Sequence, residues 1–369
     1  MEYKEYELGE LLYYEQPTPY IVESTDYNDA YGTPVLTAGK SFILGYTDEK
    51  EGIFNQLPVI IFDDFTTASQ YVNFKFKVKS SAMKILTPAK HLVLPKYIYY
   101  RMQIIDFDHS THKRYWIQQY SKIRVGIPPL AEQERIVSRI EELFSQLDAG
   151  VETLKKTKAQ LAVYRQAVLK EAFEKVSARV LLGSISESRL GKMLDSEKNI
   201  GVPRRYLRNI NVRWHSFDLS DLSEIPIEEN EVDKYSLRKG DLVICEGGEP
   251  GRCAVWDSDD VIFYQKALHR VRFTDSSNPK FYMYYLWYAA QTGQLKSLFT
   301  GTGIKHLTGQ SLVKVFVPTA ERITQDSIVN EIETHLSVCD SIEQTVDIAL
   351  QQAEAMRQSI LKDAFEGRL

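Results

Sequence analysis

Apolar residues recur every three or four positions along two stretches of the chain, which predicts two long amphipathic helices. The first stretch begins at Pro128 and Pro129, which favour a helix start. Its apolar stripe is too narrow for a globular core and has the spacing of a coiled-coil seam. The stripe occupies Ile136, Ile140, Leu143, Leu147, Val151, Leu154, Leu161, Tyr164 and Val168. Because the spacing changes after Leu154 and Gly150 weakens the helix just before it, we expect a local defect there.

The second stretch repeats the first. Residues 165–174 (RQAVLKEAFE) return as residues 357–366 (RQSILKDAFE), with seven of ten positions identical. The same offset pairs Ile136 with Ile328, Ile140 with Ile332 and Asp148 with Asp340. A repeat of this length predicts two copies of one unit, each a globular block followed by a long helix. The predicted domains are a first block at 1–125, a central helix at 126–180, a second block at 181–316 and a C-terminal helix at 317–369.

The two globular blocks have the patterns of compact α+β domains that are mostly β. Residues 59–62 form a buried-strand run, and Phe74, Phe76 and Val78 alternate with lysines, which predicts a half-buried strand. In the second block, residues 201–214 and 264–273 are predicted strands, and residues 237–256 a β-hairpin with a glycine-rich turn. Residues 95–102 (PKYIYYRM) predict a short helix, and the sequence PKFYMYY from Pro279 echoes it.

Charge alone does not favour a nucleic-acid partner, because the net charge of the 369 residues is -5. Local basic surface is therefore required. Residues 201–214 carry four arginines and no acid, and an acid-rich segment follows them at 217–241. This segregation allows a basic face for DNA, although a solvated, salt-bridged face is an equal alternative. Three cysteines without a CxxC pair and the lack of a run of about 20 apolar residues predict a cytoplasmic protein without a disulfide framework, zinc site or membrane span.

Motifs for catalysis are missing from the sequence. It contains no GxxxxGK[ST] loop for a nucleotide and no GxSxG elbow. We interpret Gly247–Gly251 as a tight turn rather than a phosphate loop, and Asp63-Asp64 as loop-capping residues rather than metal ligands. His269 and His306 are interpreted as surface or hydrogen-bonding residues. Residues 281–288 favour a core-packing helix over a base-stacking surface.

One motif resembles a known family. The sequence IPPLAEQERIV at 127–137, leading into RQAVLKEAF at 165–173, is similar to the repeated helical region of the specificity subunit of type I restriction-modification enzymes. Residues 202–211 (VPRRYLRNIN) and 239–243 (KGDLV) also resemble parts of its recognition blocks, and the likeness in layout covers essentially the whole chain. In the second copy the sequence PTAERITQD at 318–326 replaces PPLAEQE at 128–134.

The resemblance implies that the two helices pair antiparallel, as a spacer between two target-recognition domains in approximate two-fold relation. Each domain would recognise one half of a bipartite, asymmetric double-stranded DNA target, and helix length would fix the gap between the halves. The chain itself would be non-catalytic and bind no cofactor or metal. Two methyltransferase subunits using S-adenosylmethionine to methylate adenine, and restriction subunits translocating with ATP and Mg, would supply the chemistry.

The predicted DNA-binding residues are basic or polar side chains in turn-rich segments, because Arg, Lys and Asn can contact phosphates or base edges. They are Lys40, Thr66, Thr67, Lys113 and Arg114 in the first block, and Arg205, Arg208, Asn209, Arg213, Arg252 and Lys305 in the second. Two other classes of protein remain as alternatives. One is an enzyme that modifies DNA unaided, and the other is a coiled-coil scaffold that binds only proteins.

Overall fold

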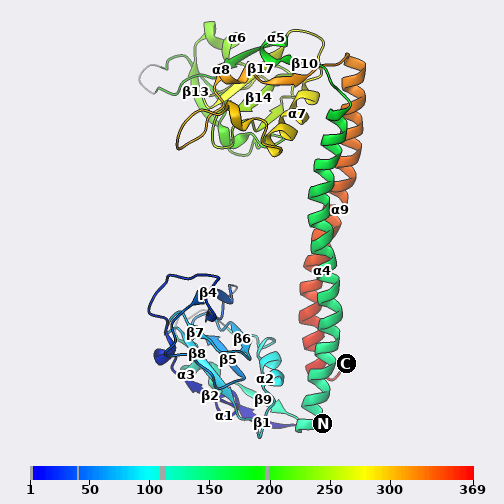
Figure 1. Ribbon diagram of the computed structural model, residues 1–369. Helices are drawn as coiled ribbons and strands as arrows, with labels where there is room; N and C mark the ends of the chain where they lie inside the picture. The colour runs from blue at the N-terminus through cyan, green and yellow to red at the C-terminus, as the bar shows by residue number, and fades with distance from the viewer. Residues whose placement is uncertain (1–2, 40, 109–113, 196–198) are drawn as a thin grey trace. The chain divides into compact units, whose positions relative to one another are not determined.

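The chain forms two compact units, each built from a globular block and parts of both long helices (Figure 1). Unit 1 comprises Met1–Leu154 with Ile348–Leu369, and unit 2 comprises Lys155–Asp347. The structure, a computed structural model, describes residues 3–39, 41–108, 114–195 and 199–369. The predicted α+β fold class with two long helices is confirmed.

The block of unit 1 contains a four-stranded sheet, a three-stranded sheet and a two-stranded ribbon. The strands of the four-stranded sheet lie in the order β2 (Leu12–Glu15), β8 (Met83–Pro88), β5 (Val59–Asp63) and β6 (Ser69–Val72). The three-stranded sheet has the order β4 (Ile43–Thr47), β3 (Thr33–Leu36) and β7 (Lys77–Val78), and the ribbon joins β1 (Lys4–Glu7) to β9 (Arg124–Ile127). The helical elements are α1 (Leu8–Leu11), η1 (Thr18–Tyr20), α2 (Pro95–Met102), α3 (Tyr115–Gln118) and η2 (Tyr120–Lys122).

The block of unit 2 repeats this plan strand for strand. Its four-stranded sheet has the order β11 (Ser186–Leu190), β17 (Leu268–Phe273), β14 (Leu242–Cys245) and β15 (Cys253–Val255). Its three-stranded sheet has the order β13 (Ser223–Ile227), β12 (Val202–Leu207) and β16 (Phe263–Tyr264), and the ribbon joins β10 (Arg179–Leu181) to β18 (Phe316–Pro318). The helical elements are α5 (Leu182–Ile185), η3 (Asn209–Asn211), η4 (Glu229–Glu231), α6 (Val232–Tyr235), α7 (Pro279–Gln291), η5 (Lys296–Leu298) and α8 (Gly309–Leu312).

Both faces of each four-stranded sheet are buried, because side chains alternate between the faces of a strand. In β5, Ile60 and Phe62 pack with α2, whereas Val59 and Ile61 pack with the three-stranded sheet. The strand β14 divides its side chains in the same way, between α7 and a core that includes β12. Each sheet therefore connects its block to the helical side of its unit.

The strand predictions for the blocks are only partly correct. The hairpin predicted at 237–256 is confirmed, with Ile244 opposite Cys253. The alternating segment at 74–78 contributes only the two-residue strand β7, and Lys77 is buried rather than exposed. Its ammonium lies 2.9 Å from Glu49 Oε2 and donates to the Glu51 carbonyl at 2.7 Å, which satisfies the buried charge. The predicted strands at 201–214 and 264–273 are shorter, because β12 ends at Leu207 and a turn separates β16 from β17.

The two long helices are α4 (Leu130–Glu174) and α9 (Arg322–Phe365). They run antiparallel within each unit, because the partners of successive α4 residues move backwards along α9. In unit 1, Asp148 pairs with Arg357, and Ile140 and Leu361 share a core cluster. In unit 2, three ion pairs of 2.7 Å join the helices, namely Lys158–Asp347, Arg165–Asp340 and Lys175–Glu331.

The local defect predicted near Gly150 is wrong, since α4 is one continuous α-helix. The changed apolar spacing has a different effect. No side chain of α4 is buried between Phe144 and Leu161. An isolated glycine costs only about 1 kcal/mol in a helix, which the cores at both ends of α4 can offset. The break in the stripe therefore interrupts the core and leaves the helix intact.

Candidate nucleic-acid interface

The turn between β5 and β6 positions the predicted DNA-binding residues of unit 1. Asp63 Oδ1 accepts hydrogen bonds from the backbone N–H groups of Phe65 and Thr66, at 2.9 and 2.8 Å. The Thr67 N–H donates to the Asp63 carbonyl at 2.9 Å, and Thr67 adopts a positive φ of 56°. Asp63 therefore caps the turn, as predicted.

Asp64 ties this turn to the start of α3. Its buried carboxylate lies 3.2 Å from the buried Lys84 ammonium and accepts the Trp116 N–H at 2.8 Å. The Tyr115 N–H donates to the Asp64 carbonyl at 2.9 Å. These bonds bring Arg114 beside Phe65, with its guanidinium 6.0 Å from the ring centroid.

Thr66, Thr67 and Arg114 therefore meet around one turn. The other predicted residues of this block, Lys40 and Lys113, lie outside the described residues. The three that meet share no sequence pattern that connects residues 66–67 with residue 114. The proximity comes from the buried Asp64, which bonds to both segments.

In unit 2 the corresponding turn, between β14 and β15, gathers Asn209 and Arg252. Asn209 Nδ2 donates to the Gly247 carbonyl at 2.8 Å, and Arg252 NH2 donates to Asn209 Oδ1 at 2.8 Å. Arg252 NH1 also donates to Glu249 Oε2 at 3.1 Å. Gly248 has a positive φ of 73°, a conformation that glycine adopts readily. The predicted tight turn is confirmed, and the Asn209 amide and the Arg252 guanidinium lie beside it.

Lys305 lies near the same turn. It lines a surface pocket of about 580 Å³ together with Gly248 and Pro250, and its ammonium donates to the Gly301 carbonyl at 2.8 Å. Asn209, Arg252 and Lys305 thus form one cluster of potential hydrogen-bond donors, which we call the β14–β15 cluster. Such donors can contact phosphates and base edges.

The remaining predicted arginines differ in their surroundings. Arg208 NH2 lies 2.6 Å from Asp221 Oδ2, and Arg213 NH2 lies 3.5 Å from Asp218 Oδ2. Arg205 is exposed on β12, with Glu224 as its cross-strand partner. Acidic residues from the 217–241 segment therefore offset part of the basic segment at 201–214. Among the predicted residues of unit 2, the β14–β15 cluster is the one that combines several donors at one turn.

One buried position behind each turn carries a polar side chain. Lys84 on β8 and His269 on β17 lie opposite Phe62 and Ile244 respectively, in matching registers. Lys84 bonds to Gln16 at 3.1 Å in addition to Asp64, whereas His269 Nε2 lies 3.1 Å from the Leu307 carbonyl. Burial lowers the pKa of His269. The prediction that His269 is a hydrogen-bonding residue is confirmed, and its bond holds the segment next to Lys305.

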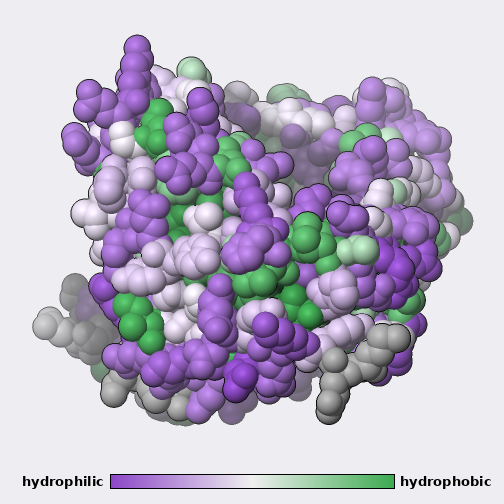
Figure 2. All heavy atoms as spheres, turned by 90° about the horizontal axis from the view of Figure 1, so that it is seen from below, coloured by the Kyte–Doolittle hydropathy of each residue, from purple (hydrophilic) through white to green (hydrophobic). Residues whose placement is uncertain are grey.

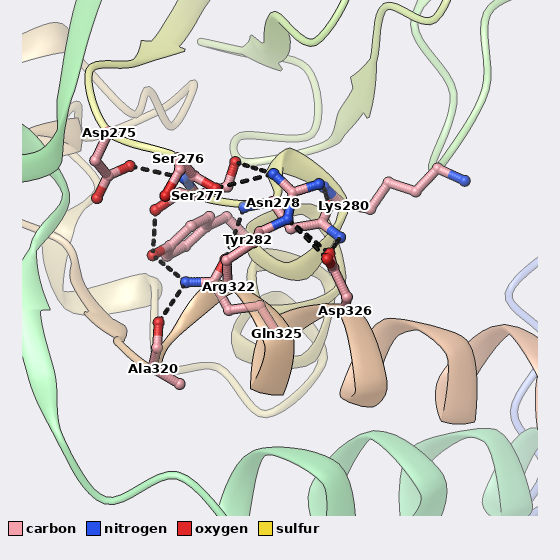
Figure 3. A network of polar contacts seen from close by, with 10 residues as sticks. All are labelled: Asp275, Ser276, Ser277, Asn278, Lys280, Tyr282, Ala320, Arg322, Gln325 and Asp326. Carbon is pink, nitrogen blue, oxygen red and sulfur yellow. Dashed lines mark hydrogen bonds and ion pairs between the residues drawn. The ribbon is translucent and has the colours of Figure 1, made fainter.

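Sequence reasoning missed two glutamines that join each block to its long helix. Gln133 is fully buried and bonds to Leu94 N, Leu92 O and Pro128 O at 2.8, 3.0 and 2.8 Å. Gln325 bonds to Asn278 N at 2.7 Å and to Ala320 O at 2.9 Å (Figure 3). We call these the glutamine latches. The same sequence spacing separates Gln133 from Gln325 and Ile140 from Ile332, so the repeat carried the signal.

The second latch shows that the helix start of unit 2 keeps the same kind of contact despite its different sequence. The segment at 318–326 differs from PPLAEQE in sequence, yet Gln325 performs the role of Gln133 two residues further from its proline. Arg322 and Asp326 add contacts around it (Figure 3): Arg322 NH1 donates to the Ser276 and Ser277 carbonyls, and Asn278 Nδ2 donates to Asp326.

The rest of each junction is also duplicated. Lys96 pairs with Glu141 in unit 1, and Lys280 pairs with Glu333 in unit 2. Phe365 packs edge-on against Tyr97 of α2, just as Phe173 packs against Phe281 of α7. The core-packing helix predicted at 281–288 is therefore confirmed as part of α7. The repeated sequence segments are thus the segments that hold a block to the helix pair.

The described residues contain no group of three or more His, Cys, Asp or Glu side chains that could hold a metal ion. Within the same ranges, no helix is long and apolar enough to cross a lipid bilayer. The surface seen in Figure 2 is mainly hydrophilic, with small hydrophobic groups between the polar side chains.

Comparison with known proteins shows which families and folds the chain resembles. Residues 1–162 match the family model of the type I restriction modification DNA specificity domain. The chain is 47% identical to the EcoR124I/EcoR124II specificity subunit of Escherichia coli, over 44% of this chain and 43% of that protein. It is 26% identical to the EcoKI specificity subunit of Escherichia coli K12, over 68% of this chain and 58% of that protein. The chain thus spans less than two thirds of the length of these curated relatives.

Solved structures extend the likeness in fold to the whole chain. A chain from a study of complex assembly and conformational transition in the type I R-M system superposes with a TM-score of 0.74 at 16% identity, over 100% of this chain and 98% of that one. The HsdS subunit from Thermoanaerobacter tengcongensis superposes with a TM-score of 0.57 at 16% identity, over 100% and 97%. The chain therefore shares the fold of these structures, and its sequence is similar to type I restriction-modification specificity subunits.

Proposed function

We propose that the chain is the non-catalytic DNA-recognition subunit of a type I restriction-modification complex. Each block recognises one half of a bipartite, asymmetric target. One observation carries the proposal: the blocks share a strand order and a junction but present different side chains at the same turn. A common scaffold with different donors at one place is the arrangement that two different half-sites require.

The side chains at the two turns suit DNA. Arginine can bind guanine through two hydrogen bonds, asparagine can bind adenine, and lysine and threonine can contact phosphates. Arg114 and Thr66 would do so in unit 1, and the β14–β15 cluster in unit 2. The net charge of -5 does not oppose this role, because donors concentrated at one turn act locally.

The helices would separate the half-sites and bind the catalytic partners. The 45 residues of α4 correspond to roughly 65 Å at about 1.5 Å per residue, and we propose that this length sets the spacer. The partners are two methyltransferase subunits, which would bind S-adenosylmethionine, and restriction subunits, which would use ATP and Mg in the cytoplasm. This chain would supply recognition and positioning, and no catalytic group.

The test is base-modification sequencing of DNA from cells that carry the cognate methyltransferase subunit, with and without this chain. A split methylated-adenine motif should appear only with the chain. Exchanging residues 1–125 for another block should change one half of the motif. Arg252→Ala should relax one position of the other half, at a cost of about 1–3 kcal/mol in binding. Arg238→Ala, an exposed arginine paired with Asp233, is the matched control.

If no motif appears although both proteins are expressed and associated, the proposal is wrong and a DNA-silent scaffold is the better description. If the purified chain alone methylates or cuts DNA, the assignment as a non-catalytic subunit is wrong.

A further inference from the structure

Unit 1 contains an open cavity at its junction, of about 570 Å³. Its walls come from α2, from α4 and from α9. The aromatic walls are Tyr99, Tyr100 and Phe144. Tyr100 and Phe144 meet edge to face at 5.7 Å between ring centroids, and the Arg357 guanidinium lies 4.3 Å from the centroid of Phe144. Aromatic rings therefore form part of the wall, and polar side chains such as Gln103, Ser145 and Gln358 form much of the rest.

The same place in unit 2 is filled by the chain itself. Tyr284 and Trp287 of α7 hold the positions that Tyr100 and Gln103 hold in unit 1, counted from the Pro-Lys start of each helix. The His215 ring packs between them, 5.2 Å from Tyr284 and 4.3 Å from Trp287 between ring centroids. Asp340, which corresponds to Asp148 in the repeat, is close enough to act on His215 electrostatically.

His215 lies in the connection between β12 and β13, which is longer than the corresponding connection of unit 1. Residues 208–222 link β12 to β13, whereas the shorter segment 37–42 links β3 to β4. His215 has a positive φ of 68°, which is uncommon outside glycine and costs energy. The backbone N–H of His215 donates to the Cys253 carbonyl at 3.1 Å, which fixes the position of the residue. The strained backbone at His215 thus places its ring where unit 1 has an open cavity.

The charges around the open cavity select its occupant. Glu141, Asp148 and Glu354 line it against one base, Arg357. Lys96 pairs with Glu141, and Arg357 pairs with Asp148. Glu354 is exposed and makes no ion pair within the described part of the chain. Glu141 and Asp148 are thus neutralised by their partners, and the charge of Glu354 remains. This negative charge disfavours a DNA phosphate, whereas a flat cation is attracted by Glu354 and by aromatic faces.

We infer that this cavity receives a protein loop carrying a flat, basic side chain, which fills unit 1 as His215 fills unit 2. The loop belongs to a methyltransferase subunit, so the inference rests on the proposed function. Docking there completes the unit 1 junction and makes the two units unequal as binding sites. One methyltransferase subunit contacts an open cavity, and the other contacts a junction that is already filled.

The test is a titration of the full chain with the purified cognate methyltransferase subunit at low salt. Glu354→Lys reverses the charge at the rim without disturbing a buried group. It should weaken one of two binding steps by about tenfold or more, because like charges at an interface are strongly unfavourable. The loss should shrink as salt is added. Ala162→Lys is the matched control: Ala162 is the exposed α4 residue that corresponds to Glu354, beside the filled junction of unit 2. It should leave both steps unchanged.

A second variant tests the shape of the cavity. Gln103→Trp places in unit 1 the ring that unit 2 carries at Trp287, and it should weaken the same step without lowering the melting temperature. A photoreactive residue at Ser145, which lines the cavity, should cross-link to an arginine- or histidine-bearing segment of the methyltransferase subunit.

The outcomes separate this inference from the proposed function. If the wild-type chain binds two methyltransferase subunits and both variants do so equally well, the inference is overturned and the proposed function stands. Cross-links from Ser145 that stay within the chain also overturn it. If the wild-type chain binds no methyltransferase subunit, both fail.

Discussion

The blocks of units 1 and 2 have one strand order, but they bury different side chains behind the β5–β6 turn and the β14–β15 turn. Unit 1 buries the Lys84–Asp64 ion pair, and unit 2 buries the neutral ring of His269 at the matching position. Lys84 and His269 have the same structural role, since each connects the four-stranded sheet of its block to a segment that carries predicted DNA-binding residues. The comparison indicates that the fold needs a buried polar contact at this position, which can be either an ion pair or a neutral hydrogen bond.

The largest effect is expected from removing the buried Lys84–Asp64 ion pair of unit 1. Lys84→Met should destabilise unit 1 by about 3–5 kcal/mol, because it leaves the buried Asp64 carboxylate without a counter-charge. Urea unfolding measured with a probe in each unit would show the loss in unit 1. Lys96→Met, which removes a partly exposed pair, should change stability by no more than about 1 kcal/mol. Equal losses for the two variants would contradict the importance of burial.

Low pH should destabilise unit 2 more than unit 1. Burial lowers the pKa of His215 to about 4, against the opposing charge of Asp340, and burial also lowers that of His269. A lowered histidine pKa means that the unfolded chain takes up a proton first as the pH falls. The stabilisation is thus complete above about pH 6.5 and is lost towards pH 4, a change of about 3 kcal/mol for His215.

This acid sensitivity should appear in unit 2, whose described histidines include the buried His269 and the half-buried His215. The one described histidine of unit 1, His91, is exposed. Urea unfolding at pH 7 and at pH 4.5 would measure it. His215→Asn should remove most of the difference, and an unchanged pH dependence in that variant would exclude His215 as the cause.

The smallest effect is expected from replacing the glutamines of the two latches. Gln133→Leu and Gln325→Leu each leave buried backbone groups without a partner, which costs about 1–3 kcal/mol. Gln133→Leu should cost more, because in unit 2 the contacts of Arg322, Asp326 and Asn278 remain. Thermal unfolding of both variants gives the order, and Arg322→Ala in the Gln325→Leu background should remove the advantage.

The sequence predicted most of the helical architecture, because the apolar repeat and the duplicated segments report directly on burial. It failed at residues whose environment is set by distant partners. Lys77 is buried because Glu49 neutralises it, and alternation in the sequence cannot show that partner. Gln133 and Gln325 are polar, so a hydrophobic pattern passes over them. The meeting of Asn209 with Arg252, and of Thr66 with Arg114, follows from strand register and a buried aspartate, which residue spacing does not encode.

The glutamine latches bond mainly to main-chain atoms of the block: Leu94 N and Leu92 O in unit 1, and Asn278 N in unit 2. Every amino acid offers the same carbonyl, and every residue except proline offers the same N–H. Natural variation can therefore replace the side chains of a block without weakening this attachment. Blocks with very different surfaces can thus be attached to the helix pair by the same two glutamines.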